Sequence, residues 1–196
     1  MGNSDPFEIL AGPADIYIAP LGTAFPLVNA APGVDWLLLA RDTDMDEAGV
    51  IVKADQTVDH VYSLGGTGSR KGFRTRQDLH VQFTLMDATV EAYSRALSDQ
   101  TVTTTAPGVG TAGYKSIALA MPGGAVATKA LLVRVKESPY GDLMLAQWEF
   151  PRAYNSGNVE TKYTKGIPVG LAFDFVVMDD NAGVKGSYRA QHALAS

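Results

Sequence analysis

The chain has 196 residues, a formal net charge of −5 and no cysteine, which excludes thiol nucleophiles, cysteine-ligated zinc, iron–sulfur clusters and a disulfide framework. At this length a single domain, residues 1–196, buries about 70% of its unfolded surface and needs no disulfide or metal to hold its core. Charged residues make up only 19% of the chain, against about 25% in a typical soluble domain, which indicates that part of the surface is covered in an oligomer.

The chain begins with a predicted N-terminal arm, residues 1–13. This arm lacks the basic and apolar segments of a signal peptide. No apolar run in the chain reaches the roughly 20 residues that are needed to cross a bilayer. We therefore expect a soluble protein that makes no contact with a membrane.

Alternation of apolar and polar side chains predicts an antiparallel β fold. The clearest stripes lie in residues 79–85 and 169–177. Turn sequences at Pro122–Gly124, Pro139–Asp142 and Asn155–Asn158 separate later strands in the way that hairpins require. We predict a β-sandwich or open barrel. The predicted strands are residues 15–19, 36–40, 50–53, 57–62, 79–85, 115–121, 131–136, 144–150 and 169–177.

One segment, about residues 87–98, predicts an α-helix that flanks the strands. Asp87 is the predicted N-cap, because its carboxylate can accept hydrogen bonds from the first turn. Val90, Tyr93 and Leu97 then fall on one face. The remaining predictions are long loops at about residues 40–49, 63–76 and 101–113, and a C-terminal tail at residues 180–196.

Two charged clusters of opposite sign lie on the predicted loops. Residues 1–60 hold ten acids and two bases, net −8, whereas residues 61–196 hold eleven acids and fourteen bases, net +3. A solvated loop is the simplest explanation of each cluster. The acidic cluster is Asp42, Asp44, Asp46 and Glu47, and the basic cluster is Arg70, Lys71, Arg74 and Arg76.

Three segments resemble ligand-binding motifs only in part. Gly108–Gly113 has the spacing GxGxxG, but no strand is predicted before it and no helix after it, so a hairpin loop explains the glycines better. Gly65–Gly72 lacks the Lys-Ser/Thr step of a phosphate-binding loop, and a pI of about 5.1 disfavours nucleic acid as its partner. We expect this loop to contact an acidic protein surface.

The segment Asp42–Asp46 begins like a calcium-binding EF-hand loop and then departs from it. The sixth position is Glu47 instead of glycine, and the twelfth is Lys53 instead of glutamate. A looser calcium site stays open as an alternative. The histidines are not at metal-ligand spacing, and no GxSxG motif is present. We predict no catalytic residue, no cofactor and no metal, so the protein is not expected to be an enzyme. The three histidines are His60, His80 and His192.

A longer segment, Lys71–Leu97, contains an Arg-Thr element, an alternating strand and a helix of the form D-x-T-x-E-x-x-x-x-A-L. Ala14–Thr23 and Glu47–Val52 add a first strand and the strand that opens a long central loop. Together these segments resemble the major tail, or tail tube, proteins of long-tailed bacteriophages over about residues 14–98. Beyond that region, Lys165–Val169 is similar to the start of the family's last strand.

The resemblance implies a β-sandwich with one flanking helix whose subunits join edge to edge into a ring, usually of six. Rings stack into a tube that carries the phage DNA and the tape-measure protein, in a virion tail assembled in the cytoplasm of a bacterial host. On this interpretation we expect the acidic and basic clusters to meet across neighbouring subunits or stacked rings.

Two other interpretations are open. Another small β-fold virion protein, for tail completion or head decoration, has a similar composition. A carbohydrate-binding β-sandwich would use Trp36, Trp148 and Tyr140 to stack on sugar rings. Trp148 belongs to an alternating stripe, however, and is expected in the core.

Overall fold

The structure, a computed structural model, describes residues 12–119, 126–136, 145–161, 163–166, 169–180 and 183–191. The prediction of a mainly β, antiparallel fold is confirmed, and the described residues contain one α-helix. The elements are β1 (Ala14–Ala19), β2 (Leu37–Ala40), the 3-10 helix η2 (Asp42–Asp44), β3 (Ile51–Tyr62), β4 (Ser69–Leu85), α1 (Val90–Ala96), β5 (Val102–Thr105), β6 (Tyr114–Ile117), β7 (Lys129–Val135), β8 (Ala146–Asn155), β9 (Leu171–Val177) and β10 (Ser187–Ala190).

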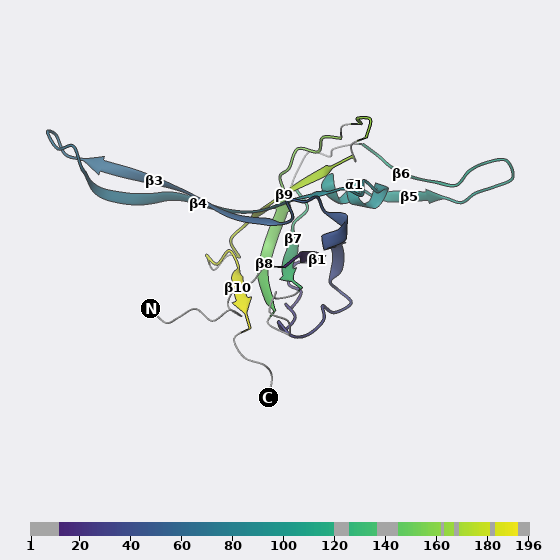
Figure 1. Ribbon diagram of the computed structural model, residues 1–196, viewed down its shortest axis with the longest axis horizontal. Coiled ribbons are helices and arrows are strands. Elements are labelled where there is room, and N and C mark those ends of the chain that lie inside the picture. The colour runs from purple at the N-terminus through teal and green to yellow at the C-terminus, as the bar shows by residue number, and fades with distance from the viewer. Residues whose placement is uncertain are drawn as a thin grey trace.

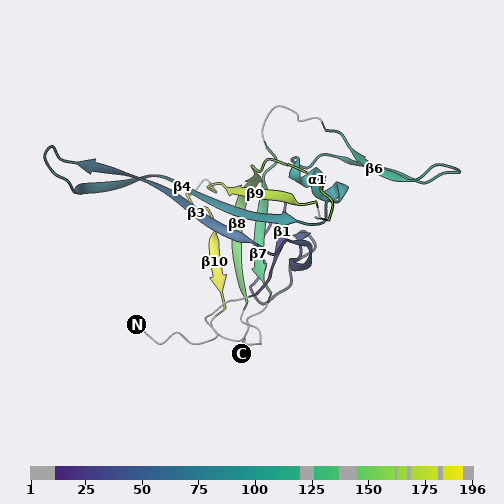
Figure 2. The same ribbon diagram turned by 45° about the horizontal axis from the view of Figure 1, so that its top comes forward.

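The large sheet follows the order β2-β1-β7-β8-β9-β4-β3, with β10 beside β8. β8 joins two halves of this sheet, because its first residues pair with β7 and β10 while Ala153 to Asn155 pair with β9. Pro151, which has no backbone N–H to donate, lies between the two stretches. Figures 1 and 2 show β7, β8 and β10 running steeply across β3, β4 and β9.

The main core fills the space between these two halves. Ile16, Leu131 and Phe150 contribute from one half and are fully buried. Phe83 and Phe173 contribute from the other half, and their rings stack with centroids 5.0 Å apart. Burying a side chain of this size stabilises a fold by about 1.5–3 kcal/mol, so this apolar contact holds the halves together.

A second, smaller core covers the opposite face of β1 and β7. Trp36, Ala130 and Leu132 are buried there, and the Trp36 indole N–H donates to the Ala24 carbonyl at 3.0 Å. The segment between β1 and β2 therefore lies on the sheet, which buries both faces of β7.

The helix is shorter than predicted and has a different N-cap. Thr89 precedes α1, and its hydroxyl accepts from the Ala92 backbone N–H at 3.1 Å. The prediction of Asp87 is wrong because Asp87 lies two residues before the cap. Ala92 and Ala96 are buried in the main core, and their small side chains let the helix approach the strands closely.

Two predicted loops are partly strand. Residues 69–76, predicted as loop, belong to β4 and pair with β3. The sequence does not predict this part of the strand, because its glycines and cations give no alternating apolar stripe. Residues 102–105, also predicted as loop, form β5, which pairs with β6 in a hairpin. The predicted acidic loop, residues 40–49, includes the short helix η2.

The strand pattern differs from the prediction in two further places. The strands predicted at residues 50–53 and 57–62 are one strand, β3. The predicted tail contains β10, which pairs with β8 through backbone hydrogen bonds while all four of its residues stay exposed. Several predictions lie outside the described residues: residues 1–11 of the arm, the turns at 122–124 and 139–142, Tyr140, Ile167, Pro168 and His192.

Candidate assembly interface

β3 and β4 continue well beyond the large sheet. β9 pairs with β4 only from Leu79 to Leu85, so residues 56–77 form a two-stranded ribbon, here called the β3–β4 arm. Nearly all of its residues are exposed, and Figure 1 shows it pointing away from the rest of the fold. Register shifts leave Arg70 and Thr75 without a partner in the ladder, and such bulges increase strand twist.

The arm exposes apolar side chains on both strands. Leu64 is fully exposed near the tip, and Phe73 is 47% exposed. An isolated two-stranded hairpin is marginally stable in water, and exposed apolar groups of this kind mark contact surfaces. The arm is therefore a surface that gains stability from a partner. Its large exposed apolar residues are Val58, Val61, Tyr62, Leu64 and Phe73.

The predicted basic cluster lies entirely on this arm. The arm holds four bases and one acid, net +3, on a chain of net −5. Arg76 forms an ion pair with Asp78 at the base of the arm, and the Lys71 ammonium lies 4.9 Å from the centre of the Phe73 ring. Within the described residues, no carboxylate forms an ion pair with Arg70, Lys71 or Arg74.

The predicted acidic cluster divides into two parts. Asp42 accepts from the Lys136 ammonium at 2.8 Å, and Lys136 also lies 3.0 Å from Asp15. This hydrogen bond holds the pKa of Asp42 below its ordinary value and raises that of Lys136. Asp42 is thus used within the chain.

The other members of the acidic cluster form no ion pair in the part of the chain that the structure describes. Asp44 accepts from the Arg41 backbone N–H at 3.2 Å, and Asp46 accepts from that of Ala48 at 3.2 Å. Glu47 is exposed. No ion pair joins the acidic and basic clusters among the described residues, so the structure does not bring them together within one chain.

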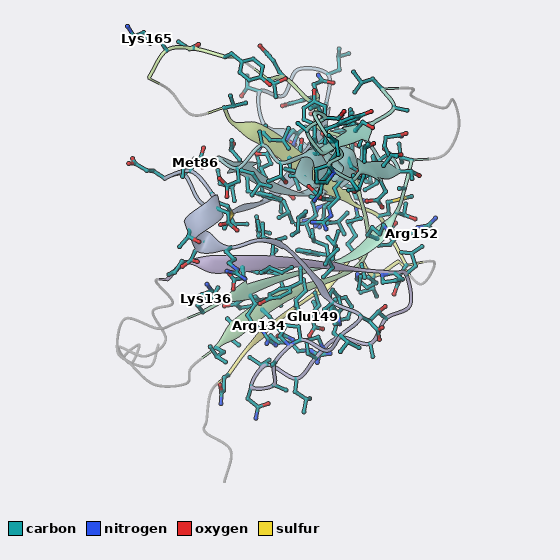
Figure 3. The ribbon with its side chains drawn as sticks, turned by 90° about the vertical axis from the view of Figure 1, so that its right-hand side faces the viewer. Met86, Arg134, Lys136, Glu149, Arg152 and Lys165 are labelled. Atoms are coloured by element: carbon teal, nitrogen blue, oxygen red, sulfur yellow. The ribbon has the colours of Figure 1, made fainter. Side chains whose placement is uncertain are left out.

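A buried polar network lies on the face of β7 and β8 that points away from the main core. Arg134, Gln147 and Glu149 are buried, and Figure 3 shows Arg134 and Glu149 close together. The Arg134 guanidinium donates to the Leu27 carbonyl at 2.9 Å, the Ala30 carbonyl at 2.6 Å and the Gln147 side chain at 3.2 Å. Burial lowers the pKa of Arg134.

The same network reaches β10. The Glu149 carboxylate accepts from the Ser187 hydroxyl at 2.9 Å and lies 3.2 Å from the Arg189 guanidinium. Buried charges are costly unless they are paired and hydrogen-bonded, and here each has several partners. The network therefore fixes the β1–β2 segment and β10 to the sheet.

The structure places the partial ligand motifs on hairpins and turns. Gly108–Gly113 forms the β5–β6 hairpin loop and is followed by a strand, which is the hairpin that the sequence favours. Gly65–Gly72 covers the tip of the β3–β4 arm. His80 meets Asp174 at 2.9 Å, and His60 lies 3.2 Å from the Ser69 hydroxyl. Among the described residues, no group of three His, Asp or Glu side chains is arranged to hold a metal ion.

The aromatic residues of the carbohydrate hypothesis are largely enclosed. Trp36 is buried and packs on Phe25, with ring centroids 5.1 Å apart. Trp148 packs against the main core and also contacts the ring of Tyr188, with centroids 4.5 Å apart.

A comparison with models of known protein families and a search of curated proteins both find no match for this chain. In the part of the chain that the structure describes, no helix is both long and apolar enough to span a membrane.

Proposed function

We propose that this chain is a structural, non-enzymatic subunit that assembles with copies of itself into stacked rings, forming a phage tail tube through which DNA passes. The observation that carries the proposal is the β3–β4 arm. It is exposed on both faces and presents apolar side chains. Three of its four cations, Arg70, Lys71 and Arg74, form no ion pair among the described residues. A partner surface would cover the apolar groups and neutralise the charge.

The open edges of the sheet support the same proposal. β2 and β3 end the strand order, and β10 lies beside β8. An edge strand has unpaired backbone groups that can pair with another chain. In a closed ring each edge would meet a neighbour, which would also explain the low share of charged surface.

The charge balance suits a passage for DNA. A lumen rich in lysine and arginine would bind the phosphates and slow transit. Outside the arm the chain is net −8, because the arm accounts for +3 of the total of −5. The proposal therefore places the arm at subunit contacts, with the tape-measure protein and other tail proteins as further partners in the virion tail.

Negative-stain electron microscopy of the purified chain at high concentration tests this proposal. We expect rings or tubes from the wild type and none from the variant with Arg70, Lys71, Arg74 and Arg76 all replaced by Glu. The matched control, Arg70→Lys, Arg74→Lys and Arg76→Lys, keeps the charge and should assemble. Circular dichroism must show that each unassembled variant is folded. Tubes of normal length from the glutamate variant would contradict the proposed role of the basic cluster.

Carbohydrate binding is a second candidate because Trp148 and Tyr188 line a cleft of about 310 Å³. Stacking on an aromatic ring is a common mode of sugar recognition, and Tyr188 is 46% exposed. A chain that stays monomeric at every concentration and binds a polysaccharide, with binding lost in Tyr188→Ala, would favour this candidate over assembly.

A further inference from the structure

A cleft of about 320 Å³ opens beside the base of the β3–β4 arm. The turn before β3, the end of β4 and the start of β9 form its walls. Its exposed apolar lining is Ile51, which is 48% exposed, together with Ala48 and Ala172, whereas Phe83 and Phe173 border it from the buried main core. A cleft of this volume is large enough for one aromatic side chain.

Two carboxylates give the cleft a negative charge. Asp46 and Asp174 line it, and no lysine or arginine does among the described residues. One oxygen of Asp46 accepts from Ala48, and one oxygen of Asp174 meets His80. In both side chains the second oxygen has no hydrogen-bond partner among the described residues, so it can accept from an incoming cation.

The arm carries the matching groups. Phe73 is half exposed with the Lys71 ammonium beside its ring, and Arg74 lies next to it in the chain. Its guanidinium donates to the Gln77 side chain at 3.3 Å and has no ion pair in the described residues. Because successive strand residues point to opposite faces, Lys71 and Phe73 share one face of the ribbon and Arg74 lies on the other. An aromatic ring with one cation beside it and a second behind it complements an apolar cleft that contains two carboxylates.

One chain cannot make this contact with itself. The cleft lies at the start of β3, while Phe73 pairs with Asp59 in the outer part of the same hairpin. Ile51 and Asp59 lie eight residues apart in β3, which is about 26 Å at about 3.3 Å per residue, and the pairing of β3 with β4 keeps the hairpin extended. The contact must join two copies. Where each arm enters the cleft of the next copy in the same direction, as the proposed stacked rings require, the contact is heterologous and produces a ring or a filament.

We infer that this cleft is the docking site for the β3–β4 arm of a second copy, with Phe73 inserted into the apolar lining and Lys71 and Arg74 paired with Asp46 and Asp174. The inference rests on the proposed self-assembly and names the surface that receives the arm. It assigns Asp46 to the contact, whereas Asp42 remains bound to Lys136.

Disulfide cross-linking tests the docking directly, because the chain has no cysteine. A Thr75→Cys chain, which keeps Phe73, is mixed with an Ala48→Cys chain whose thiol lines the cleft. Docking would hold the two thiols at a high effective concentration, so we expect at least about tenfold more cross-linked heterodimer than with a Val109→Cys control on the β5–β6 loop. Equal cross-linking to both sites would overturn the inference.

Charge reversal separates this inference from the proposed function. Asp46→Lys should abolish assembly, whereas Glu47→Lys, an equal charge change at a neighbouring residue outside the cleft lining, should leave it largely intact. Mixing Asp46→Lys with a Lys71→Ala, Phe73→Ala, Arg74→Ala chain should give one-to-one dimers that do not extend, because the second chain's arm has no charge or aromatic ring at these positions for the altered cleft to bind.

Three outcomes count against the inference. Wild-type tubes that persist in Asp46→Lys would overturn the cleft while leaving the proposed function intact. A wild type that does not assemble, together with Thr75→Cys and Ala48→Cys chains that cross-link no more than the control, would overturn both. Duplex DNA that binds the arm and leaves cross-linking at the control level would show that the basic ribbon recognises phosphates instead of a second copy.

Discussion

The strands β7 and β8 and the β3–β4 arm are built from the same kind of element but differ in what covers them. The main core covers one face of β7 and β8, and the β1–β2 segment with its polar network covers the other. The arm is exposed on both faces. An isolated strand pair is marginally stable until a face is covered. The first region is complete within one chain, and the second is the region that we propose is covered by another copy.

The environments of two arginines, Arg134 and Arg74, show the same contrast. Arg134 is buried and donates to two backbone carbonyls and a glutamine, so its charge is committed to the fold. Arg74 lies on the exposed arm and donates to Gln77 alone among the described residues. Arg134 therefore stabilises the fold through several fixed hydrogen bonds, whereas Arg74 has one in the described part of the chain and is free to pair with a carboxylate of another surface.

The largest difference between the regions should come from removing a phenylalanine in each. Phe173→Ala should destabilise the unassembled chain by about 3–5 kcal/mol, because it leaves a cavity in the main core. Phe73→Ala should change the free energy of unfolding by no more than about 0.5 kcal/mol and should instead weaken assembly. Urea unfolding of dilute protein measures both values. Comparable losses would show that the arm is part of the cooperative fold.

Replacing one arginine in each region should give a smaller difference in the free energy of unfolding. Arg134→Met should destabilise the chain by about 2–4 kcal/mol, because it leaves the buried Gln147 side chain and two backbone carbonyls without their donor. Arg74→Met should cost no more than about 0.5 kcal/mol, since exposed charges contribute little to stability. A stability loss in Arg74→Met as large as that in Arg134→Met would show that Arg74 also stabilises the fold of the single chain.

The sequence predicts the strands that bury an apolar stripe. Val81 and Phe83 in β4, and Phe173 and Phe175 in β9, alternate with polar residues and are buried. The four-residue strand β10 is missed because all of its side chains are exposed, so no periodicity marks it. The outer half of β4 is missed for the same reason. Both depend on backbone pairing, which a side-chain pattern does not record.

The candidate site is predicted only in its local parts. The basic cluster is evident as a run of residues, but its placement on a projecting ribbon depends on pairing with β3. The burial of Gln147 is missed because the segment that covers it comes from more than a hundred residues earlier, and that of Glu149 because β10 covers it. Asp174 joins Asp46 in the cleft only through the packing of separate strands, and no local motif indicates that.

Hydrogen exchange on dilute and concentrated protein tests most directly the claim that the arm is completed by a second copy. We expect the backbone amides of β7 and β8 to be protected in both samples, and those of the β3–β4 arm to exchange rapidly in the monomer and become protected on assembly. Arm amides that are as protected in the dilute monomer as those of β7, or that stay unprotected in assembled particles, would contradict the account.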